Sequence, residues 1–119
     1  MIEKKILSNL VYNETYARVV IPFLQPEYFQ SQNDRQVFES ITKHYVKYNT
    51  VPTKESLLID VDTIGLNEQL YTDVADTIKV LDEKAYDDSQ WLIDQTENFC
   101  QEKAVYNAIM KSIEIMDGE

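Results

Sequence analysis

Few side chains in this sequence have the chemistry that catalysis or metal binding requires. His44 is the single histidine and Cys100 the single cysteine. Histidine-rich metal sites are therefore excluded, since they need several such ligands at defined spacing. Cys100 has no paired base near it in the sequence, and we interpret it as a buried structural thiol. We expect His44 to be a partly exposed or hydrogen-bonded surface residue.

Motifs for phosphate binding and acid–base catalysis are not found either. The chain has two glycines and lacks the G-x-x-x-x-G-K-[ST] loop that cradles nucleotide phosphates. We interpret Asp87 and Asp88 as helix caps. The eight tyrosines could stack on bases, but most fall at helical core spacing without basic neighbours, which favours core packing. We predict that the chain is not an enzyme by itself and binds no cofactor or metal.

The composition and charge limit the fold and the partners. A length of 119 residues, with 44% hydrophobic and few turn-forming residues, is typical of one all-α domain. The net charge of −10, from 21 acidic and 11 basic residues, argues against strong direct DNA binding, which needs clustered lysines and arginines. The acidity gives solubility or suits a basic protein partner. Without a signal peptide or apolar span, we expect a cytoplasmic protein with no membrane contact.

Hydrophobic spacing predicts a compact bundle of about five short helices followed by one long projecting helix. The five predicted short helices cover residues 3–12, 14–21, 33–48, about 54–64 and about 68–81, and residues 22–29 form an apolar-anchored loop. On the third helix, the residues predicted to face inward are Val37, Phe38, Ile41, Tyr45 and Tyr48. The predicted caps are Asn13, Asn33 with Gln36, Thr53, Gly65, Asn67, and Asp87 with Gln90.

The last predicted helix is the most informative element. It covers residues 87–117 after a globule of residues 1–86, and its thirty or so residues would extend about 45 Å, past a globule about 25 Å wide. Near its end, Asn107, Lys111 and Glu114 form one narrow polar stripe on an otherwise apolar helix, which must therefore be buried on most sides by a partner surface. The predicted protein-interface residues are Val105, Tyr106, Ile109, Met110, Ile113 and Met116.

Several segments, in order, resemble the N-terminal domain of DnaB-type replicative DNA helicases, most closely the T-even-phage branch. Ile6-Leu7 and Leu10-Val11 match its opening helix. The other matching segments are Phe23-Leu24-Gln25-Pro26-Glu27-Tyr28-Phe29, Arg35-Gln36-Val37-Phe38, Tyr48-Asn49-Thr50-Val51-Pro52-Thr53, Trp91-Leu92-Ile93 and Gln101-Glu102-Lys103-Ala104. The resemblance covers essentially the whole chain, through the order and spacing of its motifs.

The resemblance implies a non-catalytic domain that forms the collar of a hexameric ring through paired helical hairpins and docks primase. It implies self-association into dimers, a hexamer in the full-length parent, and a helicase loader as a further partner. The second hairpin arm and a RecA-like ATPase domain, where ATP and Mg²⁺ would bind, are then absent from this chain. An alternative hypothesis, motivated by the charge, is a small acidic phage-type inhibitor or adaptor that binds a basic partner.

Overall fold

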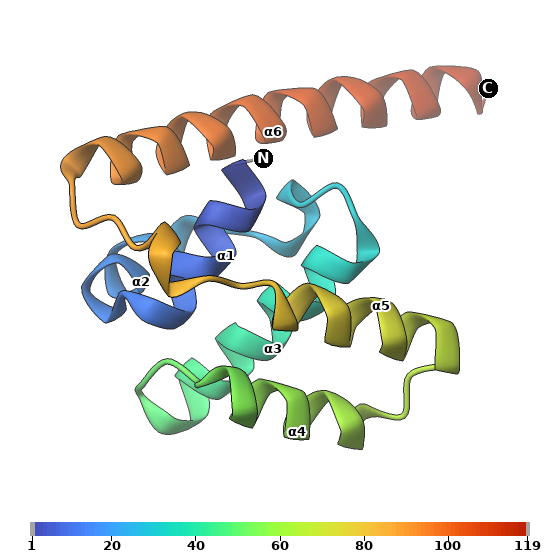
Figure 1. Ribbon diagram of the computed structural model, residues 1–119. Helices are drawn as coiled ribbons and strands as arrows, with labels where there is room; N and C mark the ends of the chain where they lie inside the picture. Colours follow the sequence, from blue (N-terminus) through green and yellow to red (C-terminus); the bar gives the residue numbers. More distant parts are fainter. Residues whose placement is uncertain (1, 119) are drawn as a thin grey trace.

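The computed structural model describes residues 2–118, which form six α-helices and three short 3₁₀ turns (Figure 1). Within these residues there is no strand, so the predicted all-α class is confirmed. The α-helices are α1 (Ile2–Tyr12), α2 (Glu14–Val20), α3 (Gln32–Tyr48), α4 (Lys54–Ile64), α5 (Glu68–Lys79) and α6 (Gln90–Asp117). The 3₁₀ turns are η1 (Ile21–Phe23), η2 (Pro26–Tyr28) and η3 (Glu83–Ala85).

Local capping explains where most helices begin and end. The Asn13 side chain accepts a hydrogen bond from Tyr16 N at the start of α2, and Asn67 caps α5 through Leu70 N. Thr53 forms a capping box with Ser56 at the start of α4. The helix ends at Gly65, whose positive φ of 84° places it in the left-handed region that glycine adopts at low cost. These predicted caps are confirmed.

Two predicted caps are wrong. Helix α3 begins before Asn33, because Ser31 accepts the hydrogen bond from Asp34 N and serves as the N-cap. Gln36 lies inside the helix and its side chain donates to Ser40 Oγ. Helix α6 is preceded by Ser89 in the N-cap position, and the predicted capping box between Asp87 and Gln90 does not form.

The core lies between α1, α3 and the helices that cover them. Helix α1 buries Ile6, Leu7 and Leu10, and α3 packs against α1, α4 and α5. The predicted inward residues of α3 are buried at Val37, Phe38 and Ile41, and Tyr45 is half-buried. Tyr48 is 57% exposed, so that prediction is wrong: the last turn of α3 presents this ring to solvent beside His44.

The segment between α2 and α3 is anchored by apolar side chains, as predicted. Pro22 is the second residue of η1 and Pro26 is the first residue of η2. Leu24 and Phe29 are buried. The centroid of the Phe29 ring lies 5.2 Å from the ring centroid of Phe38 in α3 and 5.7 Å from that of Phe99 in α6. Phe29 therefore joins the connecting segment, the central helix and the long helix in one core.

Helix α6 lies along one side of the molecule (Figure 1), and its residues 108–118 are all exposed. Twenty-eight residues correspond to about 42 Å of helix at 1.5 Å per residue. The longest dimension of the whole molecule is 47 Å. The predicted projecting helix is thus present, and the rest of the molecule positions only its first part.

Candidate protein interface on the long helix

The first half of α6 is fixed to the globule by buried contacts. Leu92, Thr96, Phe99 and Cys100 are its buried residues. Thr96 Oγ1 donates to Leu92 O at 2.7 Å, so the 2.6 Å contact between Tyr16 Oη and Thr96 Oγ1 has the tyrosine as donor. The burial that accompanies this bond raises the pKa of Tyr16 above its usual range. Trp91 is 53% exposed, so it is not on the face that packs.

Two buried asparagines hold the chain where it enters α6. Asn9 Nδ2 donates to Lys5 O and to Ala85 O, at 2.9 and 2.8 Å. Its Oδ1 accepts from Asp87 N at 2.9 Å. Asn13 Nδ2 donates to Asp87 O at 3.0 Å. Helices α1 and α2 therefore set the direction in which α6 leaves the globule.

The Asp87 carboxylate serves this connection and not the helix cap that the sequence predicted. It accepts hydrogen bonds from the side chain and the backbone of Ser89, which lower the pKa of Asp87. Its second oxygen lies 3.6 Å from Lys5 Nζ. Asp87 therefore links α1 to the turn before α6.

Among the described residues, the last hydrogen bond between α6 and the globule is made by Asn107, whose Nδ2 donates to Glu27 O at 3.0 Å. Lys111 and Glu114 follow at i+4 and i+7, so they lie on the same face of the helix as Asn107. The predicted polar stripe therefore continues the side that faces the globule. With 3.6 residues per turn, Val105 and Ile109 lie on the opposite face.

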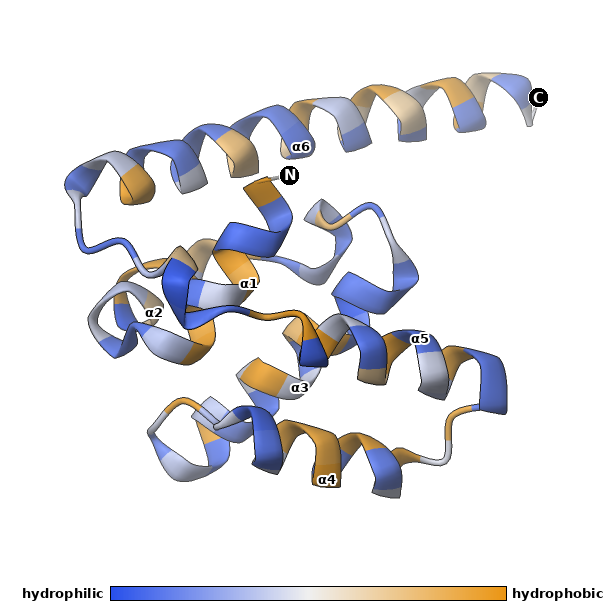
Figure 2. Cartoon of the chain, viewed as in Figure 1, coloured by the Kyte–Doolittle hydropathy of each residue, from blue (hydrophilic) through white to orange (hydrophobic). Residues whose placement is uncertain are grey.

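The six predicted interface residues are all exposed, by 44% to 73%. Figure 2 shows hydrophobic residues recurring along the projecting end of α6. Ile115, 61% exposed, extends the apolar surface and was missed by the sequence prediction. The structure thus brings Val105, Tyr106, Ile109, Met110, Ile113 and Met116 onto one accessible helix. Their role as an interface stays a prediction.

The residues with catalytic potential are not brought together. Cys100 is buried, as predicted, and burial, together with the nearby Glu97 carboxylate, raises its thiol pKa to about 11. In the described residues, no three histidine, cysteine or acidic side chains are arranged to hold a metal ion. Tyr16 is buried, but Tyr48, Tyr86 and Tyr106 are exposed, so the core interpretation holds for only part of the tyrosines.

No helix within residues 2–118 combines the length and the hydrophobicity needed to cross a bilayer. The exposed apolar surface of α6 is interrupted by Asn107, Lys111, Glu114 and Asp117. A surface of this kind, apolar with charges on one side, suits a protein partner.

The sequence of this chain is similar to that of a DnaB-like replicative helicase, which confirms the predicted resemblance. One relative is the DnaB-like replicative helicase of Enterobacteria phage T4, which is 34% identical over 110 residues. The match includes 92% of this chain and 23% of the phage protein, so the chain spans less than a quarter of that relative's length. No family model matches the chain.

Proposed function

We propose that this chain is a non-catalytic assembly and docking domain of a replicative DNA helicase, which contributes to the collar of the helicase ring and docks primase. The observation that carries the proposal is the exposed apolar surface of α6, on a chain that is similar to the phage T4 helicase. ATP and Mg²⁺ would bind elsewhere in the parent protein. Binding of MgATP to this chain, measured by calorimetry, would contradict the proposal that nucleotide binds elsewhere in the parent protein.

The spacing of the exposed side chains supports pairing with a second helix. Val105, Ile109, Ser112 and Met116 follow one another at intervals of four, three and four residues, which is the pattern of a coiled-coil seam. Ile113 and Tyr106 flank this seam. At about 25 cal/mol per Å² of apolar area, burial of these side chains contributes several kcal/mol before association costs. A second copy of the chain supplies the same seam, so self-association is the simplest use.

The first half of α6 limits where two copies can pair. Continued toward the N-terminus, the seam contains Gln95, Asn98 and Glu102 before it reaches Trp91. These polar side chains are costly to bury without partners. We therefore place the helix–helix contact in the C-terminal half of α6, after Glu102.

The interface is tested with the double variant Ile109→Asp/Ile113→Asp. Two aspartates on the apolar face should leave a folded monomer, whose mass light scattering would report across a range of concentrations. Lys111→Asp is the matched control, because it changes the net charge by the same two units on the polar face of the same helix and should leave self-association in place. Unchanged oligomers in the double variant would show that the interface is elsewhere.

Primase docking requires a separate test. Immobilised cognate primase should retain this chain, or a longer version that includes the second hairpin arm, in a pull-down assay. Retention of the longer version alone would assign docking to the complete hairpin. Retention of neither version would contradict the docking role and leave the self-association result unaffected.

A further inference from the structure

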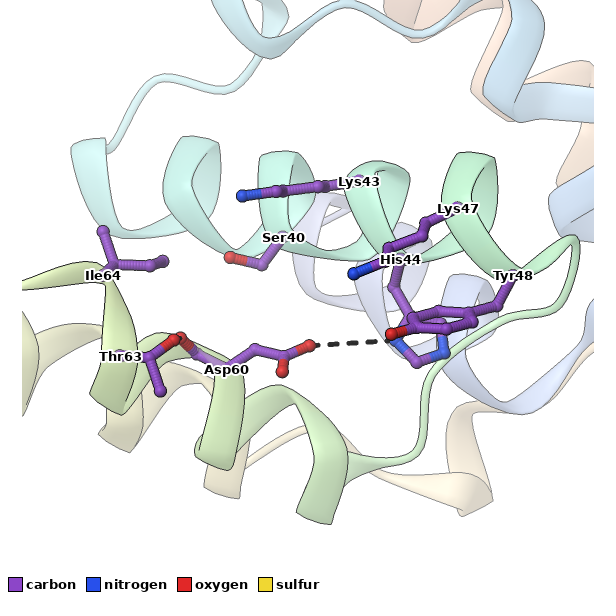
Figure 3. Close-up of a pocket in the computed structure, with 8 residues that line it drawn as sticks. All are labelled: Ser40, Lys43, His44, Lys47, Tyr48, Asp60, Thr63 and Ile64. Atoms are coloured by element: carbon purple, nitrogen blue, oxygen red, sulfur yellow. Dashed lines mark hydrogen bonds and ion pairs between the residues drawn. The ribbon is translucent and has the colours of Figure 1, made fainter.

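A cleft between α3 and α4 lies away from the α6 surface and has no place in the assembly proposal. Its volume is about 220 Å³. The side chains that give it chemistry are Ser40, Lys43, His44 and Lys47 from α3 and Asp60 and Thr63 from α4. In Figure 3, the Asp60 carboxylate points from α4 toward His44 on α3.

The cleft concentrates positive charge in an acidic protein. Lys43 and Lys47 lie one turn apart on α3, and neither forms an ion pair with a described residue. Asp60 is the one acidic side chain of the lining. With the imidazole neutral, the lining carries a net charge of +1 (two lysines and one aspartate), whereas the whole chain carries −10. The pair of lysines disfavours a cation in this place and favours an anion.

His44 has an unsatisfied nitrogen at the same cleft. Its Nδ1 is buried and has no hydrogen-bond partner among the described residues. The nearest acidic atom, Asp60 Oδ2, is 3.8 Å away, which is longer than a hydrogen bond. A buried polar atom without a partner is costly, and it commonly indicates a bound water, ion or ligand at the site.

The polar groups of the cleft are mainly unused donors. Ser40 Oγ accepts from Gln36 Nε2 at 3.3 Å, and its own proton is not used in any contact among the described residues. Thr63 Oγ1 already donates to Asp60 O at 2.7 Å. The cleft is smaller than the pockets of about 300–1,000 Å³ that hold drug-sized ligands, so the bound group must be small. We propose that this cleft binds a small oxyanion, a phosphate or carboxylate group, with Lys43 and Lys47 as charge partners and the Ser40 hydroxyl as donor.

The test uses nuclear magnetic resonance on the 119-residue chain, because a single histidine gives one set of imidazole resonances. Inorganic phosphate and acetate are titrated separately at pH 7, with sodium chloride holding the ionic strength constant. Saturable shifts of the His44 imidazole, with a millimolar dissociation constant, are expected for at least one anion, and the comparison tells phosphate from carboxylate. Shifts that do not saturate, or that chloride alone reproduces, would overturn the proposal.

Four variants make the test specific. Lys43→Gln and Lys47→Gln should each weaken binding roughly fivefold through loss of a charged donor. Lys79→Gln on α5 changes the charge equally outside the lining and should have no effect. Asp60→Asn should strengthen anion binding at least about twofold, since it removes the opposing charge. Weaker anion binding in Asp60→Asn, with the fold intact by circular dichroism, would contradict the proposed arrangement of charges.

Discussion

The two halves of α6 have the same secondary structure and opposite relations to the rest of the molecule. The first half, up to Glu102, is held by buried side chains and the Tyr16–Thr96 hydrogen bond. The second half, after Glu102, contacts the globule through Asn107, which donates to Glu27 O. From residue 108 to residue 118 every residue is exposed. The apolar residues of the second half are as hydrophobic as those of the core.

The difference shows that the second half of α6 depends on the first for its position. Tertiary packing supplies most of the stability of helices in proteins, and only the first half has such packing in this chain. The first half holds the helix axis in place, so the second half presents its apolar side chains in a fixed direction. Mutations in the first half should therefore change the free energy of unfolding, and mutations in the second half should change association.

The largest expected effect is that of Phe99→Ala. Phe99 is 5% exposed and packs on Phe29, so truncation leaves a cavity where α6 meets the core. The free energy of unfolding should fall by about 3–5 kcal/mol, as measured by urea denaturation. A loss below about 1 kcal/mol would show that α6 is not part of the cooperative core.

The second-largest loss in the free energy of unfolding is expected for Asn9→Ala. Removal of this amide leaves Asp87 N without its partner and leaves Ala85 O with Lys5 Nζ as its remaining donor. The loss of these part-buried hydrogen bonds should lower the free energy of unfolding by about 2–3 kcal/mol. Asn98→Ala, at an exposed position on α6, is the matched control and should change little. Equal effects of the two variants would contradict the role of Asn9 in fixing the start of α6.

The Cys100 thiol should give stability a pH dependence. The ordinary thiol pKa of 9.0 is raised to about 11 in the fold, so the unfolded chain loses its proton first as the pH rises. The contribution of the protonated thiol to the free energy of unfolding is fully present below pH 9 and is lost as the pH rises toward 11. At 1.36 kcal/mol per pKa unit the loss amounts to about 2 kcal/mol. The loss is measured by urea denaturation of the wild type and of Cys100→Ala at pH 8 and at pH 11. If the difference in free energy of unfolding between the two proteins is the same at both pH values, the predicted pH dependence is wrong.

Tyr16→Phe should have a smaller effect. It removes one buried hydroxyl, the donor to Thr96 Oγ1, and leaves the ring in place. A loss of about 1 kcal/mol is expected in urea denaturation. Tyr48→Phe is the matched control, since the Tyr48 side chain is exposed. If Tyr16→Phe leaves the free energy of unfolding unchanged, this hydrogen bond does not hold α6.

The helices and much of the core could be predicted from the sequence because spacing and capping are local. Asn13, Thr53, Gly65 and Asn67 act at the predicted helix ends. At the start of α3, Ser31 and Asn33 are both suitable N-caps, and the structure has Ser31 in that role. Local patterns carry no information about that choice.

The contacts that orient α6 could not be predicted, because they join residues more than seventy positions apart. Asn9 meets Ala85 and Asp87, and Tyr16 meets Thr96. In the sequence, Asn9 is one of several polar residues of the first helix, and its burial was not predicted. The apolar stripe of α6 was predictable because its hydrophobicity is local, but the face it turns to solvent depends on Asn107 and Glu27.

The smallest effect on the free energy of unfolding is expected for Ile109→Ala, in the second half of α6. Ile109→Ala removes as much apolar surface as many core substitutions, but Ile109 is 54% exposed and lies on the face away from the globule. At protein concentrations where the chain is monomeric, the free energy of unfolding should change by no more than about 0.5 kcal/mol. At higher concentrations, the same variant should weaken self-association measured by light scattering. A loss above 1 kcal/mol that does not depend on concentration would mean that this side chain packs within its own chain, and the two halves of α6 would then not differ as the structure indicates.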